Sequence, residues 1–145
     1  MRLLRYELGT VWTVYLYCRD DETCQILDVL TTCGDIGARM LADLRKVASR
    51  SLQSLNRDTE FSKPIVNTQL FEFRLPTSRG PTPRVSYFFD RNYVIVCALA
   101  LLKKSDKLPQ NFIDGSLNIR NAYLSNGGVK GASVEIYDDT GEEES

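Results

Sequence analysis

Four basic residues at the ends of predicted strands have the types and spacing to bind a phosphodiester. Arg74 closes a strand that contains Glu72, Arg84 opens the next strand, and Lys103 and Lys104 end a long apolar strand. If the first two strands pair as a hairpin, both guanidiniums point to one face of a sheet. They could then bind a phosphate bidentately and stabilise the charge that grows on a pentacovalent transition state. Two alternatives remain open: Arg74 forms an ion pair with a nearby acid, or the two lysines are only solvated charges that end the strand.

The residue types that the chain lacks narrow this chemistry further. It has no histidine, which excludes Ser-His-Asp and Cys-His nucleophiles and His-bound metals. Neither GxxxxGK[ST] nor GxGxxG occurs to hold a nucleotide. The four cysteines show no CxxC spacing, so we interpret them as reduced and mostly buried thiols. We therefore expect no metal and no other cofactor.

The charges divide the chain into a basic body and an acidic end. Residues 1–130 hold all 18 Lys and Arg against 13 acids, and the last fifteen residues hold six acids and no base. Between residues 44 and 130 there are 14 basic residues and six acids, a surface that attracts phosphates. We predict one domain over residues 1–128 and a flexible acidic tail over 129–145. This tail is an inert extension, a mimic of RNA that covers the basic surface, or a mimic of an antitoxin.

Apolar periodicity indicates an α+β fold. It predicts strands at 11–18, 69–75, 84–89 and 93–102, and helices at 23–30, 35–55 and 110–124. The order β-α-α-β-β-β-α favours helices packed on one face of a small, mainly antiparallel sheet. No 18-residue apolar run and no signal-peptide core occurs, so we expect a cytoplasmic protein without a membrane partner.

The polar face of the helix expected at 35–55 is basic and has two interpretations. It is either a solvated outer face or a rim that faces phosphates. The basic residues on and just after this helix are Arg39, Arg45, Lys46, Arg50 and Arg57.

Motifs in the strand region resemble a known family in their order and spacing. They are Phe71-Glu72-Phe73-Arg74, then Arg84-Val85-Ser86-Tyr87-Phe88, an apolar strand at Val94-Ile95-Val96, and Lys103-Lys104 five positions before Pro109. The chain is similar here to the phage-derived, HigB-like branch of the RelE toxin superfamily. That branch typically shows an E-L-R strand, an R-V-x-Y-F strand, an apolar strand and a K-K-x-x-x-x-P entry to the last helix. The resemblance covers roughly residues 12–124 and implies a RelE-like fold with two N-terminal helices on the sheet.

The resemblance implies the toxin of a type II toxin–antitoxin system, a metal-independent, ribosome-dependent mRNA endoribonuclease. In such chemistry the 2′-OH attacks the adjacent phosphate. Carried over by position, Arg74 and Arg84 would stabilise the phosphorane, and Lys103 and Lys104 would supply charge or transfer protons. The expected partners are a small helix-turn-helix antitoxin, the ribosome and mRNA. Further RNA-binding residues would be Arg79, Arg91, Lys107 and Tyr123.

The alternative is a catalytically inactive member of the same fold. Such a phage or prophage protein would use the basic surface to bind RNA, the ribosome or a host protein.

Overall fold

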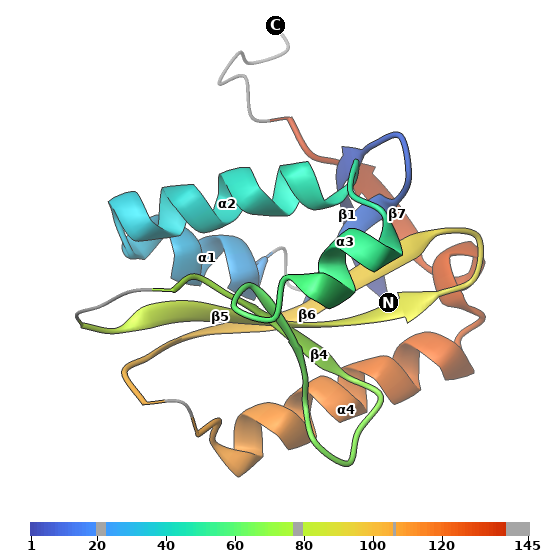
Figure 1. Cartoon of the computed structure of the whole chain (residues 1–145). Coiled ribbons are helices and arrows are strands. Elements are labelled where there is room, and N and C mark those ends of the chain that lie inside the picture. Colours follow the sequence, from blue (N-terminus) through green and yellow to red (C-terminus); the bar gives the residue numbers. More distant parts are fainter. Residues whose placement is uncertain (20–22, 77–79, 106, 139–145) are drawn as a thin grey trace, which may run out of the picture.

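A mixed seven-stranded sheet forms the centre of the α+β fold (Figure 1). The computed structural model describes residues 1–19, 23–76, 80–105 and 107–138. The sheet order is β3-β4-β5-β6-β2-β1-β7. Neighbouring strands are antiparallel except for the pairs β2–β6 and β1–β7, which are parallel. The strands are β1 (Arg2–Leu8), β2 (Thr13–Cys18), β3 (Ser62–Pro64), β4 (Phe71–Arg74), β5 (Thr82–Asp90), β6 (Val94–Lys103) and β7 (Ser133–Ile136).

Helices cover both faces of this sheet. In Figure 1, α1, α2 and α3 lie over one face and α4 lies over the other. This arrangement differs from the expected one, in which helices share a single face. The helices are α1 (Gln25–Thr32), α2 (Asp35–Val47), α3 (Leu52–Arg57) and α4 (Gln110–Ser125), followed by a short 3-10 helix η1 (Gly128–Gly131). No helix in the described ranges is long and apolar enough to cross a membrane.

The single helix expected at 35–55 is broken between α2 and α3. Backbone N–H groups of Val11 and Trp12 both donate to the Ala48 carbonyl at 2.9 Å, and the Trp12 indole donates to the Arg50 carbonyl at 2.8 Å. These carbonyls therefore accept hydrogen bonds from the segment before β2, and the helical hydrogen-bond pattern does not continue. Ser51 then caps α3 by accepting a bond from the Ser54 N–H at 3.0 Å.

Two strands, β1 and β3, were not expected from the sequence, and β7 lies in the segment that we predicted as a flexible tail. In β1 the register shifts between Arg5 and Glu7, which breaks the alternation that identifies a strand. The short β3 pairs with β4 at one edge of the sheet. At the opposite edge β7 pairs in parallel with β1, so the described part of the segment 129–145 adds a strand to the sheet. Residues 139–145 lie outside the described residues.

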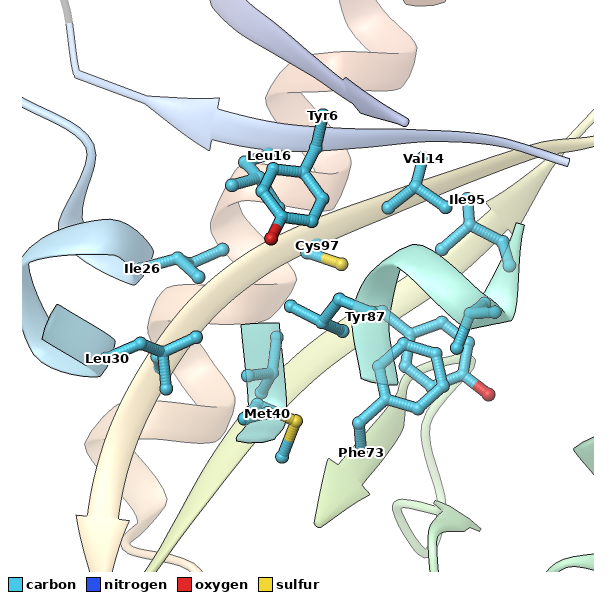
Figure 2. Packing of buried hydrophobic residues seen from close by; sticks show 14 of the residues in the cluster. Tyr6, Val14, Leu16, Ile26, Leu30, Met40, Phe73, Tyr87, Ile95 and Cys97 are labelled. Atoms are coloured by element: carbon cyan, nitrogen blue, oxygen red, sulfur yellow. The ribbon is translucent and has the colours of Figure 1, made fainter. Parts of the chain in front are cut away.

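The larger core lies between the sheet and α1–α3 (Figure 2). Tyr87 packs in this core: its ring stacks on Phe73 with centroids 3.8 Å apart. Its hydroxyl is 2.6 Å from Ser62 Oγ. On the other face, Phe88 and Tyr123 belong to a second core beneath α4. The sheet is thus buried on both sides, as the apolar sequence of β6 requires.

The cysteines are free thiols, as we inferred from their spacing. Cys18, Cys24 and Cys97 are buried and Cys33 is half-buried. The turn between β5 and β6 includes Asn92, whose φ is 65°. Tyr93, which we expected to begin the strand, has a φ of 59° and belongs to this turn.

Candidate nucleic-acid interface

The ends of β4 and β6 and the start of β5 bring the motif residues to one end of the sheet. Arg74 is the Cα partner of Arg84 in the β4–β5 ladder, which is the hairpin register that we assumed. Thr82 is the partner of Lys103 in the β5–β6 ladder. The cations thus come from three adjacent strands.

Arg84, however, lies beneath the surface. Only 2% of its surface is exposed. Its Nη1 donates to Glu72 Oε1 at 2.9 Å, and its Nη2 donates to the Ser105 carbonyl at 3.2 Å. We expected Arg84 to face a phosphate, but the structure places it in a buried ion pair that links β4 to the segment after β6.

A row of polar groups surrounds this pair on the sheet face toward α4. Glu72 and Arg84 share that face with Ser86, whose Oγ is 2.7 Å from Ser116 Oγ on α4 and accepts the Leu99 N–H at 3.1 Å. Burying ions is costly unless each charge is paired and hydrogen-bonded. The Glu72–Arg84 pair satisfies the charge part of that condition, and the contact between Ser86 and Ser116 joins this row to α4.

Arg74 remains at the surface, where it is half-exposed. Its Nε donates to the Glu60 carbonyl at 3.2 Å, and its backbone N–H donates to the Phe61 carbonyl at 2.7 Å. The turn before β3 therefore fixes the stem of this side chain. Glu72, the sequence neighbour that we considered as its ion-pair partner, pairs with Arg84.

The lysines surround the same end of the sheet. Lys103 is the last residue of β6 and is half-buried, whereas Lys104 and Lys107 are exposed in the segment that leads to α4. The Arg84–Ser105 hydrogen bond anchors this segment directly after Lys104. Together, Arg74, Lys103, Lys104 and Lys107 form a set of cations that we call the lysine end.

Two of the other expected RNA-binding residues, Arg91 and Tyr123, do not join the lysine end. Arg79 lies outside the described residues. Arg91 lies in the turn at the far end of β6, a strand of ten residues, so at about 3.3 Å per residue it is roughly 30 Å away.

Tyr123 was expected to contact RNA, but it is fully buried. Its hydroxyl donates to Asp90 Oδ2 at 2.5 Å, and its ring packs edge-on against Phe88. Burial, followed by the Asp90 carboxylate, raises the pKa of Tyr123 above its usual value. The expectation fails because the apolar stripe of α4 turns this residue toward the sheet.

A mixed-charge cleft beside Arg74 was only partly foreseen. It encloses about 450 Å³ between α2, the turn at 58–61 and the end of β4. Arg50 lies over the Phe61 ring at 5.7 Å and pairs with Asp58 at 3.2 Å. The sequence signal for this cleft was the basic face of the helix predicted at 35–55. The lining residues are Arg39, Asp43, Lys46, Arg50, Asp58, Glu60, Phe61, Leu75 and Pro76.

Chemically, the lysine end offers a guanidinium and three amines. Such a set binds phosphates and stabilises added negative charge. Comparisons of the chain with models of protein families, with curated proteins and with solved structures found no match.

Proposed function

We propose that the protein binds RNA through the lysine end and acts there as a metal-independent, ribosome-dependent mRNA endoribonuclease, the toxin of a type II toxin–antitoxin system. The single observation that carries this proposal is the placement of Arg74 at the end of β4 and of Lys103, Lys104 and Lys107 at and after the end of β6, two strands that flank β5. The HigB-like order of the motifs supports it. So does the order of the elements from β2 to α4, in which helices precede the antiparallel strands β4–β6.

In this proposal the RNA 2′-OH attacks the adjacent phosphorus and the 5′-oxygen leaves. Arg74 binds the nonbridging phosphate oxygens and stabilises the phosphorane. Lys103 and Lys104 hold the flanking phosphates or transfer protons. Arg84 acts as a positioning residue, because it holds the carbonyl of Ser105, next to Lys104. A small helix-turn-helix antitoxin, the ribosome and mRNA are the proposed partners.

A second function is favoured by the burial of Arg84 and Tyr123. With these groups inside the protein, the surface holds fewer side chains for acid–base chemistry. In this second proposal the same lysine end binds RNA, the ribosome or a host protein without cutting RNA.

Inducing the protein in a bacterium separates the two functions. The nuclease arrests growth and produces mapped mRNA cuts that disappear in Arg74→Ala and in the double variant Lys103→Ala/Lys104→Ala. Arg57→Ala is the matched control, because Arg57 is an exposed cation at the end of α3. Growth without mRNA cuts in several hosts, together with RNA binding by the purified protein, selects the binding function.

A further inference from the structure

A second hollow opens at the opposite end of the sheet from the lysine end. It encloses about 620 Å³ between the β5–β6 turn, the end of α4 and η1. This volume lies within the range of about 300–1,000 Å³ that is typical of small-molecule sites. The hollow is separated from the lysine end by the ten-residue strand β6, so its occupation is independent of the proposed nuclease site.

The charges of this hollow favour an anion. Arg91 and Lys130 are exposed at its rim. Asp90 is the one acid among its described lining residues, and both of its oxygens already accept hydrogen bonds. Oδ1 accepts the Arg91 N–H at 2.7 Å and Oδ2 accepts the Tyr123 hydroxyl at 2.5 Å. A ligand therefore meets two cations and one carboxylate, each of whose oxygens already accepts a hydrogen bond.

One nearby feature opposes an anion, namely the C-terminal end of α4, which carries partial negative charge. The last turn offsets this effect through its own hydrogen bonds. The Asn126 N–H donates to the Ala122 carbonyl at 3.0 Å and the Gly127 N–H donates to the Leu124 carbonyl at 3.2 Å. With these carbonyls bonded, the side-chain charges of Arg91 and Lys130 dominate.

The rest of the wall suits an aromatic ring. Tyr15, Val94 and Leu124 line the hollow, and Leu124 is 46% exposed. An apolar wall next to a cationic rim matches a base joined to a phosphate, because bases stack on aromatic and aliphatic surfaces.

Glycine determines how closely η1 approaches the hollow. Gly128 has a φ of 68°, which favours glycine. A Cβ at this position would lie 3.2 Å from Asp90 Oδ2 and 3.4 Å from the Tyr123 hydroxyl oxygen. A side chain here would push η1 away from the Asp90–Tyr123 pair and change the shape of the wall.

We propose that this hollow binds a nucleoside phosphate, with the phosphate between Arg91 and Lys130 and the base against Tyr15 and Leu124. The ligand is either a free nucleotide or one nucleotide of an RNA strand, since both present the same chemistry. The site goes beyond the proposed nuclease function because neither Arg74 nor the lysines of that site line it.

The test is an NMR titration of the full-length protein with AMP, UMP, adenosine, inorganic phosphate and an eight-nucleotide RNA. AMP and UMP are expected to shift the amide signals of residues around 90–94 and 124–130, and to bind at least tenfold more tightly than adenosine or phosphate. Arg91→Gln/Lys130→Gln should weaken this binding tenfold or more, and Gly128→Ala should weaken it as well. Arg57→Gln is the matched control.

The variants of the lysine end keep this inference separate from the proposed function. Lys103→Gln/Lys104→Gln should leave AMP binding unchanged, whatever it does to mRNA cutting. If only the eight-nucleotide RNA shifts the amide signals around the hollow, and these shifts require Arg91 and Lys130, the bound nucleotide belongs to an RNA strand. The proposal is overturned if no ligand shifts these signals at millimolar concentration. It is also overturned if the double variant Arg91→Gln/Lys130→Gln binds as well as the wild type while keeping its melting temperature.

Discussion

Arg84 Nη1 lies 2.9 Å from Glu72 Oε1 in an ion pair that α4 and the strands hold away from solvent. The same guanidinium donates to the Ser105 carbonyl. One buried side chain therefore joins β4, β5 and the segment that carries Lys104 and Lys107. The arginine that most resembles a catalytic cation in the sequence organises the surface cations instead of joining them.

Removing one partner of this pair should destabilise the protein strongly. Arg84→Met leaves the Glu72 carboxylate buried without its cation, which costs about 3–5 kcal/mol of unfolding free energy. The double variant Arg84→Met/Glu72→Met removes both charges and should recover most of that loss. Urea denaturation measures both values. A cost below about 1 kcal/mol for Arg84→Met would show that the pair is not buried as described.

Two glycines in helices should respond in opposite ways to substitution by alanine. A Cβ on Gly37 would lie 1.8 Å from the Leu30 carbonyl oxygen, so Gly37→Ala must push α2 away from α1. A Cβ on Gly115 would meet only the flexible Leu99 side chain, at 3.2 Å. Alanine at this position stabilises the helix by about 0.5–1 kcal/mol relative to glycine. Melting temperatures should fall by several degrees for Gly37→Ala and hold or rise for Gly115→Ala. Equal changes in the two variants would contradict the close α1–α2 contact.

Stability should decline at alkaline pH. Burial raises the pKa of Tyr87, Tyr123 and Cys97, so the folded protein keeps protons that the unfolded chain releases from about pH 8.5 for Cys and about pH 10 for Tyr. The stabilisation is complete below those values and is lost as the pH rises above them. Urea midpoints between pH 8 and 10.5 should fall, and less steeply for Tyr87→Phe. A flat profile would contradict the burial of these groups.

Cys24 should ionise more readily than the other buried cysteines. A hydrogen bond from the Cys18 thiol and the N–H groups at the start of α1 lower the pKa of Cys24 to about 7, although burial opposes this shift. Iodoacetamide labelling followed by mass spectrometry should give a half-maximal rate for Cys24 near pH 7. Cys97, whose pKa is raised by burial, should stay unlabelled until the protein unfolds. Labelling of Cys24 that rises only above pH 8.5 would contradict the hydrogen bond.

The strands with regular alternation were predictable, whereas the irregular and edge elements were not. Periodicity located β2, β4, β5 and β6 and the helices α1 and α4 to within a few residues, because each buries a continuous apolar face. The bulge in β1 removed that signal, and all four residues of β7 are exposed. The break between α2 and α3 depends on hydrogen bonds from Val11 and Trp12, which helix periodicity cannot reveal.

The strand pairing at the candidate site was predictable from the sequence, but the burial of its side chains was not. Alternation and hairpin pairing placed Arg74 opposite Arg84. Burial of Arg84 depends on α4 covering that face, whereas the order of the elements predicted helices on one face of the sheet only. The packing of α4 on the sheet also explains why Tyr123 is buried. The spacing of apolar residues in α4 did not show that Tyr123 faces the sheet.

The most direct test of the central proposal uses purified protein, ribosomes and a defined mRNA in a reconstituted translation reaction, with 5′ ends mapped by primer extension. The protein is first treated with EDTA to remove bound metal, and we expect it still to cut the ribosome-bound mRNA. Arg74→Ala and Lys103→Ala/Lys104→Ala should reduce the cutting rate at least a hundredfold, whereas Arg57→Ala should not. Intact mRNA with the wild-type protein, or equal cutting by all variants, would contradict an active site at the lysine end.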